Sequence, residues 1–131
     1  MWKWLTTRSK PRASALTRGA AGEQQALDFL HARGLKLIAR NFRARGGELD
    51  LVMDDRGTLA VIEVRARSKS RHGHAAETVD ARKQRRVILA TQVFLAAHPQ
   101  FGQSPLRFDI VALDADVPPV WLRGAFDATD Q

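Results

Sequence analysis

The chain has 131 residues, of which 44% are hydrophobic, and carries a formal net charge of +7 at pH 7. This length suits one domain with its own core. The sequence has no cysteine, which excludes disulfide scaffolds and thiolate metal sites and is typical of a reducing compartment. No apolar run approaches the roughly 18 residues that a membrane helix needs. We therefore expect a cytoplasmic protein without a membrane partner.

The positive charge is distributed unevenly along the chain. Residues 1–45 carry ten Lys or Arg and two Asp or Glu, and residues 65–86 carry eight and two. From residue 106 onward, five aspartates outnumber two arginines. Segregated positive charge favours a polyanionic partner, because contacts to phosphates release bound counterions. The charge pattern thus predicts a nucleic acid as partner, with DNA preferred.

Hydrophobic periodicity and turn residues predict six regular elements. Residues 1–16 read as a flexible basic leader, and a helix is expected over residues 18–33, ended by Gly34. Strands are expected over residues 35–42, 46–52 and 59–65, followed by a polar loop over residues 66–75. A second helix over residues 78–97 ends at His98-Pro99, and a further strand covers residues 106–113.

The predicted order α-β-β-β-α-β indicates an α/β fold, with a central mixed sheet flanked by helices. We expect a single domain over residues 17–117. Residues 118–131 are expected to form a C-terminal tail, part of which packs back onto the domain.

Carboxylates interrupt the second and third strands where core residues would be expected. Asp50 follows Glu48 by two positions, and Glu63 precedes Arg65 by two, so each pair shares a strand face. One hairpin register would pair Asp50 with Val61, and a slip of two residues would pair Asp50 with Glu63; both keep Asp50, Glu63 and Arg65 on one face. Close like charges need a cation between them. Mg²⁺ would satisfy this need, and so would an ion pair with Arg65 that braces the hairpin; the spacing leaves both open.

Glu23 is a third candidate ligand. It precedes Ala26 and Leu27 on the apolar stripe of the first helix, from which its carboxylate could reach over the sheet. It could equally be a first-turn acid that the helix dipole favours.

Five short runs together resemble the YraN-like family of small bacterial proteins. They are Gly22-Glu23, residues 40–43, 47–52, 61–65 and 107–111. The resemblance covers residues 18–113. It implies a restriction-endonuclease-like fold, shared with archaeal Holliday-junction resolvases, and Mg²⁺- or Mn²⁺-dependent hydrolysis of phosphodiester bonds in DNA, including branched or structured DNA.

The resemblance also implies roles for individual residues. Asp50, Glu63 and Glu23 would hold the metal, and together with Arg65 they would form the catalytic set. Arg65 stands where the superfamily motif has lysine. Arginine stays charged and cannot act as a base, but it could position water or stabilise charge on the phosphate.

Basic residues around these strands are the candidate nucleic-acid contacts, and they are Arg43, Arg45, Arg67, Lys69, Lys83 and Gln84. Two other functions remain open: a nucleic-acid-binding protein that no longer cuts, which Arg65 favours, and a module whose carboxylates bind a basic protein. A homodimer is also compatible with the sequence, because a two-stranded substrate presents equivalent phosphates.

Overall fold

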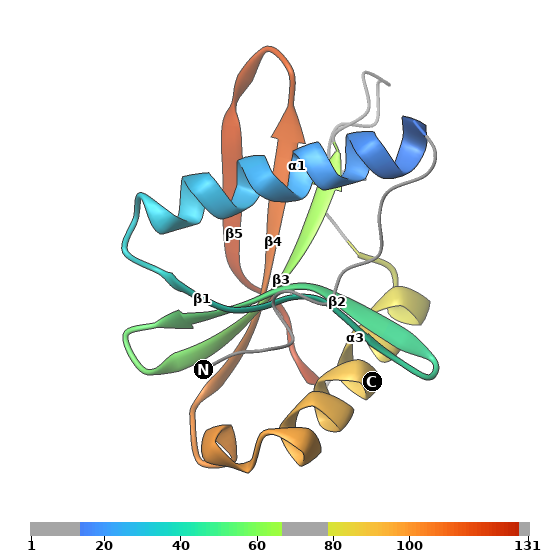
Figure 1. Ribbon diagram of the computed structural model, residues 1–131, viewed down its shortest axis with the longest axis vertical. Helices are drawn as coiled ribbons and strands as arrows, with labels where there is room; N and C mark the ends of the chain where they lie inside the picture. The colour runs from blue at the N-terminus through green and yellow to red at the C-terminus, as the bar shows by residue number, and fades with distance from the viewer. Residues whose placement is uncertain (1–13, 67–78, 129–131) are drawn as a thin grey trace.

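A computed structural model describes residues 14–66 and 79–128 of the chain, with side chains described from Gly19 onward. It contains one five-stranded sheet in the order β1-β2-β3-β4-β5 (Figure 1). The elements are α1 (Ser14–His31), β1 (Lys36–Ala44), β2 (Gly47–Asp55), β3 (Thr58–Ala66), α3 (Ala81–Ala97), the short 3-10 helix η2 (Pro99–Phe101), β4 (Leu106–Asp114) and β5 (Val117–Phe126).

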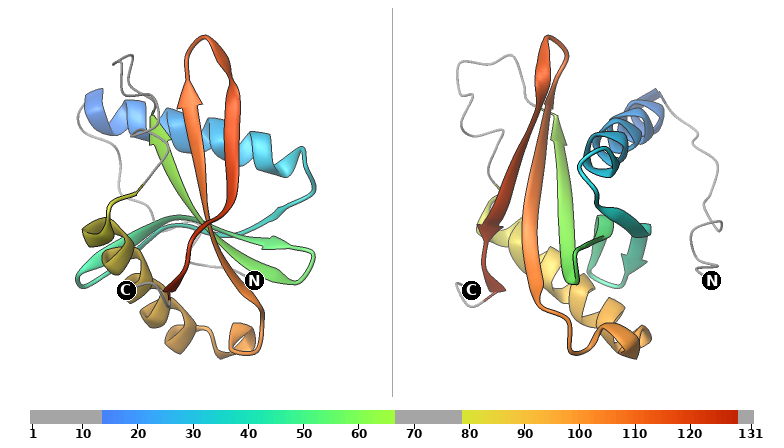
Figure 2. Two further views of the ribbon diagram at one scale, coloured as in Figure 1. Left: turned by 180° about the vertical axis from the view of Figure 1, so that it is seen from behind. Right: turned by 90° about the vertical axis from the view of Figure 1, so that its left-hand side faces the viewer.

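The sheet is mixed, as the sequence predicted. Neighbouring strands are antiparallel except β3 and β4, which run parallel and are connected through α3. The β1–β2 hairpin crosses β4 and β5 at a large angle (Figures 1 and 2), which reflects the twist inherent in β-sheets. Two parallel strands need a long crossover connection. In the chain, α3 lies in the connection between β3 and β4.

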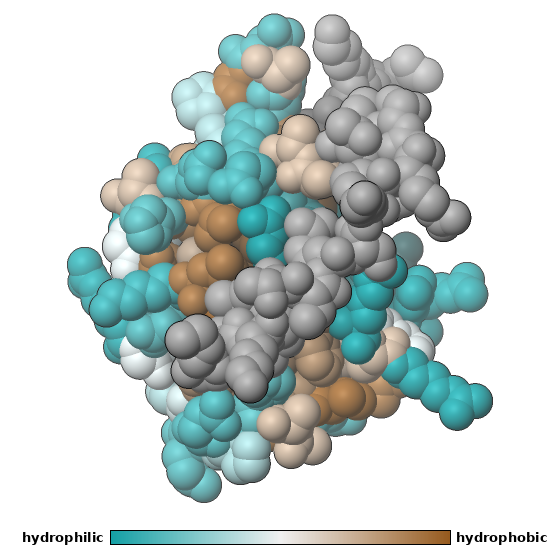
Figure 3. Space-filling view, viewed as in Figure 1, coloured by the Kyte–Doolittle hydropathy of each residue, from teal (hydrophilic) through white to brown (hydrophobic). Residues whose placement is uncertain are grey.

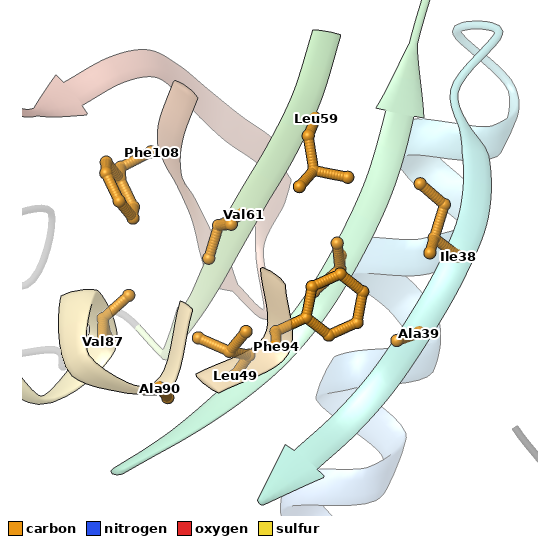
Figure 4. Packing of buried hydrophobic residues seen from close by; sticks show 10 residues of the cluster. Ile38, Ala39, Leu49, Leu59, Val61, Val87, Ala90, Phe94 and Phe108 are labelled. Carbon is orange, nitrogen blue, oxygen red and sulfur yellow. The ribbon is translucent and has the colours of Figure 1, made fainter. Parts of the chain in front are cut away.

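Helices α1 and α3 cover opposite faces of the sheet. Ala26 and Leu30 of α1 lie in one core cluster, whereas Val87, Ala90 and Phe94 of α3 lie in the other. Figure 4 shows the α3 side chains directed at strand residues of β1, β2 and β3. Both helices bury an apolar stripe at helical spacing. The sheet therefore lies between two helices, and the central part of its middle strands is shielded from water on both sides.

The β2–β3 hairpin adopts the second of the two registers that the sequence allowed. Asp55 pairs with Thr58 and Leu51 with Ile62. Arg56 and Gly57 form the turn with φ of 55° and 95°, the left-handed pair that a tight hairpin turn requires. Extended by one position, this register would place Asp50 opposite Glu63.

The element bounds differ from the predictions at both ends of the chain. Helix α1 begins at Ser14, inside the expected leader, and β5 (Val117–Phe126) includes residues 118–126 of the expected tail. The prolines at 118 and 119 weaken the strand signal of β5, but they lie at its start on an edge of the sheet, where prolines are tolerated. The other leader residues and the polar loop with Arg67 and Lys69 lie outside the described residues.

A buried aspartate fastens β5 to β4. Asp109 is fully buried and accepts hydrogen bonds from Arg107 at 2.8 and 2.9 Å, from Trp121 Nε1 at 3.0 Å and from Gly124 N at 2.9 Å. Arg107 also donates to Asp55 at 2.9 Å. A buried carboxylate with this many donors is compensated for its lost hydration. Asp109 therefore has a structural role, and its partner is Arg107.

Candidate active site

The strands β2 and β3 separate at Asp50. Their ladder ends at Leu51–Ile62, whereas the ladder between β1 and β2 continues to Gly47. Leu49 packs in the core under α3 and Leu51 in the core under α1, so the regular alternation of faces breaks at Asp50. The sequence predicted strict alternation here. The break directs the Asp50 carboxylate into the gap between the two strands.

The Asp50 carboxylate replaces a strand partner for β3. Its Oδ2 atom accepts a hydrogen bond from the backbone N–H of Val64 at 2.9 Å. The ladder between β2 and β3 has already ended at this point, so β2 offers this N–H no backbone acceptor. Burial and, to a smaller extent, the nearby Glu63 carboxylate raise the pKa of Asp50 from 3.8 to about 7, although the Val64 bond and Lys83 act in the opposite direction. Asp50 is therefore a carboxyl group whose charge is costly in the absence of a cation.

Glu63 lies within hydrogen-bonding reach of Asp50 and carries a cationic partner. Its side chain is 5% exposed, and its Oε2 atom lies 3.0 Å from Lys83 Nζ of α3. Burial raises the pKa of Glu63, and Lys83 acts in the opposite direction. The structure thus brings together the two central acids of the predicted site, with a lysine on one of them.

The predicted brace between Arg65 and the carboxylates is weaker than this lysine contact. Arg65 is half-buried, and it is the smallest of the causes that act on the pKa of Glu63. Lys83 stands first among the groups that lower that pKa. The sequence indicated Lys83 as a phosphate contact at the start of the second helix. In the structure its ammonium group lies beside the acid pair, because α3 and Glu63 share one side of the sheet.

Glu23, the third predicted metal ligand, is not grouped with Asp50 and Glu63 in the described part of the chain. Its Oε1 atom accepts a hydrogen bond from Asn41 Nδ2 of β1 at 2.8 Å. Within residues 14–66 and 79–128, no three Asp, Glu or His side chains are grouped closely enough to hold a metal ion. Asp50 and Glu63 still fit a hard divalent cation, since Mg²⁺ needs only one or two carboxylates and takes its other ligands from water and phosphate.

A cationic surface adjoins the acid pair. We use this name for the exposed side chains of Arg43, Arg45, Arg82, Arg85 and Arg86. Two segments distant in sequence form it, because the β1–β2 turn packs directly on α3. A Cβ added at Gly47 would lie 2.2 Å from the carbonyl oxygen of Arg86.

Arg43 and Arg45 were predicted from the sequence as nucleic-acid contacts, whereas the three α3 arginines were not. Their clustering within residues 82–86 could have indicated them. Gln84, also expected to contact nucleic acid, donates to Val79 O at 2.7 Å at the start of α3. Figure 3 shows hydrophilic side chains over much of the molecular face seen in Figure 1, with hydrophobic surface gathered beside them. None of the helices in the described part of the chain is long and apolar enough to span a membrane.

Comparison with known proteins finds a matching family model and similar relatives that cover most of the chain. The model of "Uncharacterised protein family UPF0102" matches residues 22–113. A UPF0102 protein of Pseudomonas putida strain GB-1 is 47% identical over 121 residues, covering 89% of this chain and 98% of the relative. One from Xanthomonas axonopodis pv. citri is 48% identical over 120 residues, covering 90% and 98%. One from Janthinobacterium sp. strain Marseille is 43% identical over 119 residues, covering 91% and 94%.

Proposed function

The chain belongs to the UPF0102 family, and we propose that it is a Mg²⁺- or Mn²⁺-dependent nuclease that hydrolyses phosphodiester bonds in DNA. The observation that carries this proposal is the pair of half-buried Asp50 and buried Glu63 with Lys83 beside it. Two neighbouring acids that are largely withdrawn from water repel each other, which costs stability unless a cation or a proton is bound. A site that sacrifices stability in this way is a candidate for function.

The acid pair supplies what phosphodiester hydrolysis requires. Asp50 and Glu63 offer the hard oxygen ligands that Mg²⁺ prefers. When bound, a divalent cation lowers the pKa of a coordinated water and neutralises charge on the attacked phosphate. We infer from the family resemblance alone that Glu23 contributes to this site, directly or through a water molecule.

Lys83 fills the role that Arg65 cannot perform. The superfamily motif places a lysine two residues after the glutamate, where this chain has Arg65. Lys83 comes instead from α3 and lies 3.0 Å from Glu63. A lysine side chain can donate or accept a proton during the reaction, whereas an arginine side chain remains protonated. We infer that Lys83 assists the attacking water and that Arg65 stabilises charge on the phosphate.

The cationic surface supports DNA as the substrate. Arg82, Arg85 and Arg86 lie on α3, as Lys83 does, and the β1–β2 turn next to Arg43 and Arg45 packs against that helix. Arginine binds phosphate oxygens in pairs and without sequence preference. A phosphate backbone that follows this surface would be led to the acid pair.

The decisive experiment is a cleavage assay with Mg²⁺ or Mn²⁺ on single-stranded, duplex, flapped and four-way DNA. We expect metal-dependent cutting that falls at least about 100-fold in Asp50→Asn and Glu63→Gln. The exposed Asp116→Asn variant is the matched control and should cut normally. Lys83→Arg keeps the ion pair but not the transferable proton, so it should lose cutting while retaining DNA binding. Cutting that survives in the Asp50 and Glu63 variants would refute the site.

A second function follows from one specific observation. If the amine of Lys83 serves only to neutralise Glu63, the chain would bind DNA without cutting it, as Arg65 in the motif position favours. The same assay decides between the two: binding without cutting in every metal and on every substrate would assign this second function. Binding to none of the four DNA substrates would favour the third function, a carboxylate surface for a basic protein.

A further inference from the structure

Two large apolar side chains are exposed on the outer face of α3. Leu89 is 44% exposed and Val93 is 41% exposed. They lie four residues apart, so they are neighbours on the helix surface. The side of the helix that packs on the sheet is a different one, because it carries the buried residues Val87, Ala90 and Phe94. The apolar character of Leu89 and Val93 is therefore not required by the core.

The two side chains continue the line of arginines on the same helix face. Arg82 and Arg86 precede Leu89 by seven and three residues. Val93 in turn follows Arg86 by seven residues, and these spacings keep side chains on one face of a helix. The β1–β2 turn borders this line, because a Cβ added at Gly46 would lie 2.8 Å from Leu89 Cδ2. The cationic surface thus ends in an apolar patch, which we define as Leu89 and Val93 and call the α3 patch.

Charge and shape together limit what can cover the α3 patch. The neighbouring arginines favour a polyanion, but the outside of a continuous duplex presents phosphates and no apolar surface. A helix fills the major groove by itself, and the turn packed against α3 at Leu89 adds to its width. Unstacked bases, in contrast, expose apolar ring faces. Apolar side chains that insert at such steps are a known way to contact DNA.

We propose that Leu89 and Val93 contact the bases of DNA at an unstacked step while the backbone lies on the cationic surface. The inference rests on the DNA-binding part of the proposed function and names the form of DNA that this surface selects. Lys83 precedes Leu89 by six residues, which is about 9 Å along the helix axis. One DNA strand advances about 3.4 Å per nucleotide. The contacted base would thus lie about two to three nucleotides from the phosphate at the acid pair.

The test compares binding to two duplexes of one sequence, one continuous and one with a short single-stranded gap that carries 2-aminopurine. Fluorescence anisotropy is measured in EDTA, so that no cutting occurs. Leu89→Gln and Val93→Thr make the α3 patch polar with little change in size. Leu106→Gln is the matched control, because Leu106 is 40% exposed and lies at the start of β4. Thermal unfolding checks that all variants are folded.

We expect the wild type and Leu106→Gln to bind the gapped duplex about 3- to 10-fold more tightly than the continuous one, the gain from covering the exposed part of one leucine. The 2-aminopurine fluorescence should rise on binding, because the base leaves its stack. Leu89→Gln should lose this preference and the fluorescence change, and Val93→Thr should lose part of both. Affinity for the continuous duplex should stay unchanged in all variants.

Equal affinity of the wild type for both duplexes, or a preference that survives in Leu89→Gln, would overturn this inference and leave the nuclease proposal to its cleavage assay. A wild type that binds neither duplex would overturn the inference together with DNA as the substrate. If Leu89→Gln instead changes the sedimentation of the free protein and neither DNA affinity, the α3 patch would belong to contacts between copies of this chain, and the inference would be wrong.

Discussion

At the scale of single residues, the site is defined by one interrupted pairing. Asp50 lies where β2 and β3 part, and its carboxylate takes the Val64 N–H that a strand partner would have accepted. The same position puts it beside Glu63 in a buried setting. A hydrogen bond to a charged acceptor contributes about 1.5–3 kcal/mol, which does not remove the cost of burying two carboxylates together. The residue is therefore suited to binding rather than to stability.

The pH dependence of stability should report on Asp50. Because its pKa rises from 3.8 to about 7 on folding, the folded protein holds this proton more tightly than the unfolded chain does. The contribution of Asp50 to stability is thus lost as pH rises from about 4 to about 7. Asp50→Asn should be more stable than the wild type at pH 8, by roughly 3 kcal/mol, and equal to it near pH 4.

Urea unfolding of the metal-free protein at several pH values measures this difference. Asp116→Asn, an exposed substitution of the same kind, should follow the wild type throughout. An Asp50→Asn variant less stable than the wild type at pH 8 would mean that the buried carboxylate is compensated without a cation. Added Mn²⁺ should close the gap by stabilising only the wild type.

At the scale of elements, the fold depends on close packing between the β1–β2 turn and α3. Gly47 lies against the backbone of Arg86 so closely that a Cβ atom would not fit. Gly46, with a φ of 90°, lies close to the side chain of Leu89. This contact sets the position of α3 on the sheet and hence the distance from Lys83 to Glu63. It also joins the two halves of the cationic surface. Packing and site geometry are therefore linked through one glycine.

Gly47→Ala should destabilise the protein by about 1–3 kcal/mol, since the added methyl group must push α3 away from the turn. Gly19→Ala is the matched control: a Cβ at Gly19 meets nothing within 4 Å, and alanine favours a helix, so stability should stay equal or rise. Urea unfolding measures both. A Gly47→Ala variant that is as stable as the wild type would show that the turn and α3 are not tightly packed in solution.

At the scale of the whole molecule, charge and sheet architecture act together. The net charge of +7 is concentrated in part at the contact of turn and helix, while the acids of the site are buried between the layers. A polyanion is therefore attracted over a long range and meets the acids only at close range, where a metal would shield them. Because α1 and α3 cover opposite faces of the sheet, the acids lie in a region of lower dielectric constant than bulk water.

The salt dependence of DNA binding should identify this surface. Affinity should fall steeply with salt, and substituting Arg82 and Arg86 by Gln should reduce the slope of log K against log salt by about one for each arginine. Arg56→Asn, which removes an exposed charge at the distant β2–β3 turn, should change the slope less. Fluorescence anisotropy on a labelled duplex measures the slopes, and equal slopes for all variants would place the DNA elsewhere.

Much of this fold and site was predictable from the sequence because the signals are local. Alternating apolar residues predict β2, β3 and β4, helical spacing predicts α1 and α3, and acids within apolar strands indicate a site wherever they occur. Strand β5 escaped prediction because Pro118 and Pro119 obscure its start. Its anchor, Asp109, obtains its partners Trp121 and Gly124 only through folding.

The sequence by itself determined the element order, the mixed α/β class and the identity of the two central acids, because each follows from residue type and spacing along the chain. Only the tertiary structure decided that Lys83 lies on Glu63, that Asn41 donates to Glu23, and that the β1–β2 turn packs on α3 at Arg86. These contacts join residues 18 to 39 positions apart. Their geometry depends on sheet twist, a break in strand pairing and helix packing, none of which is encoded in any short stretch of sequence.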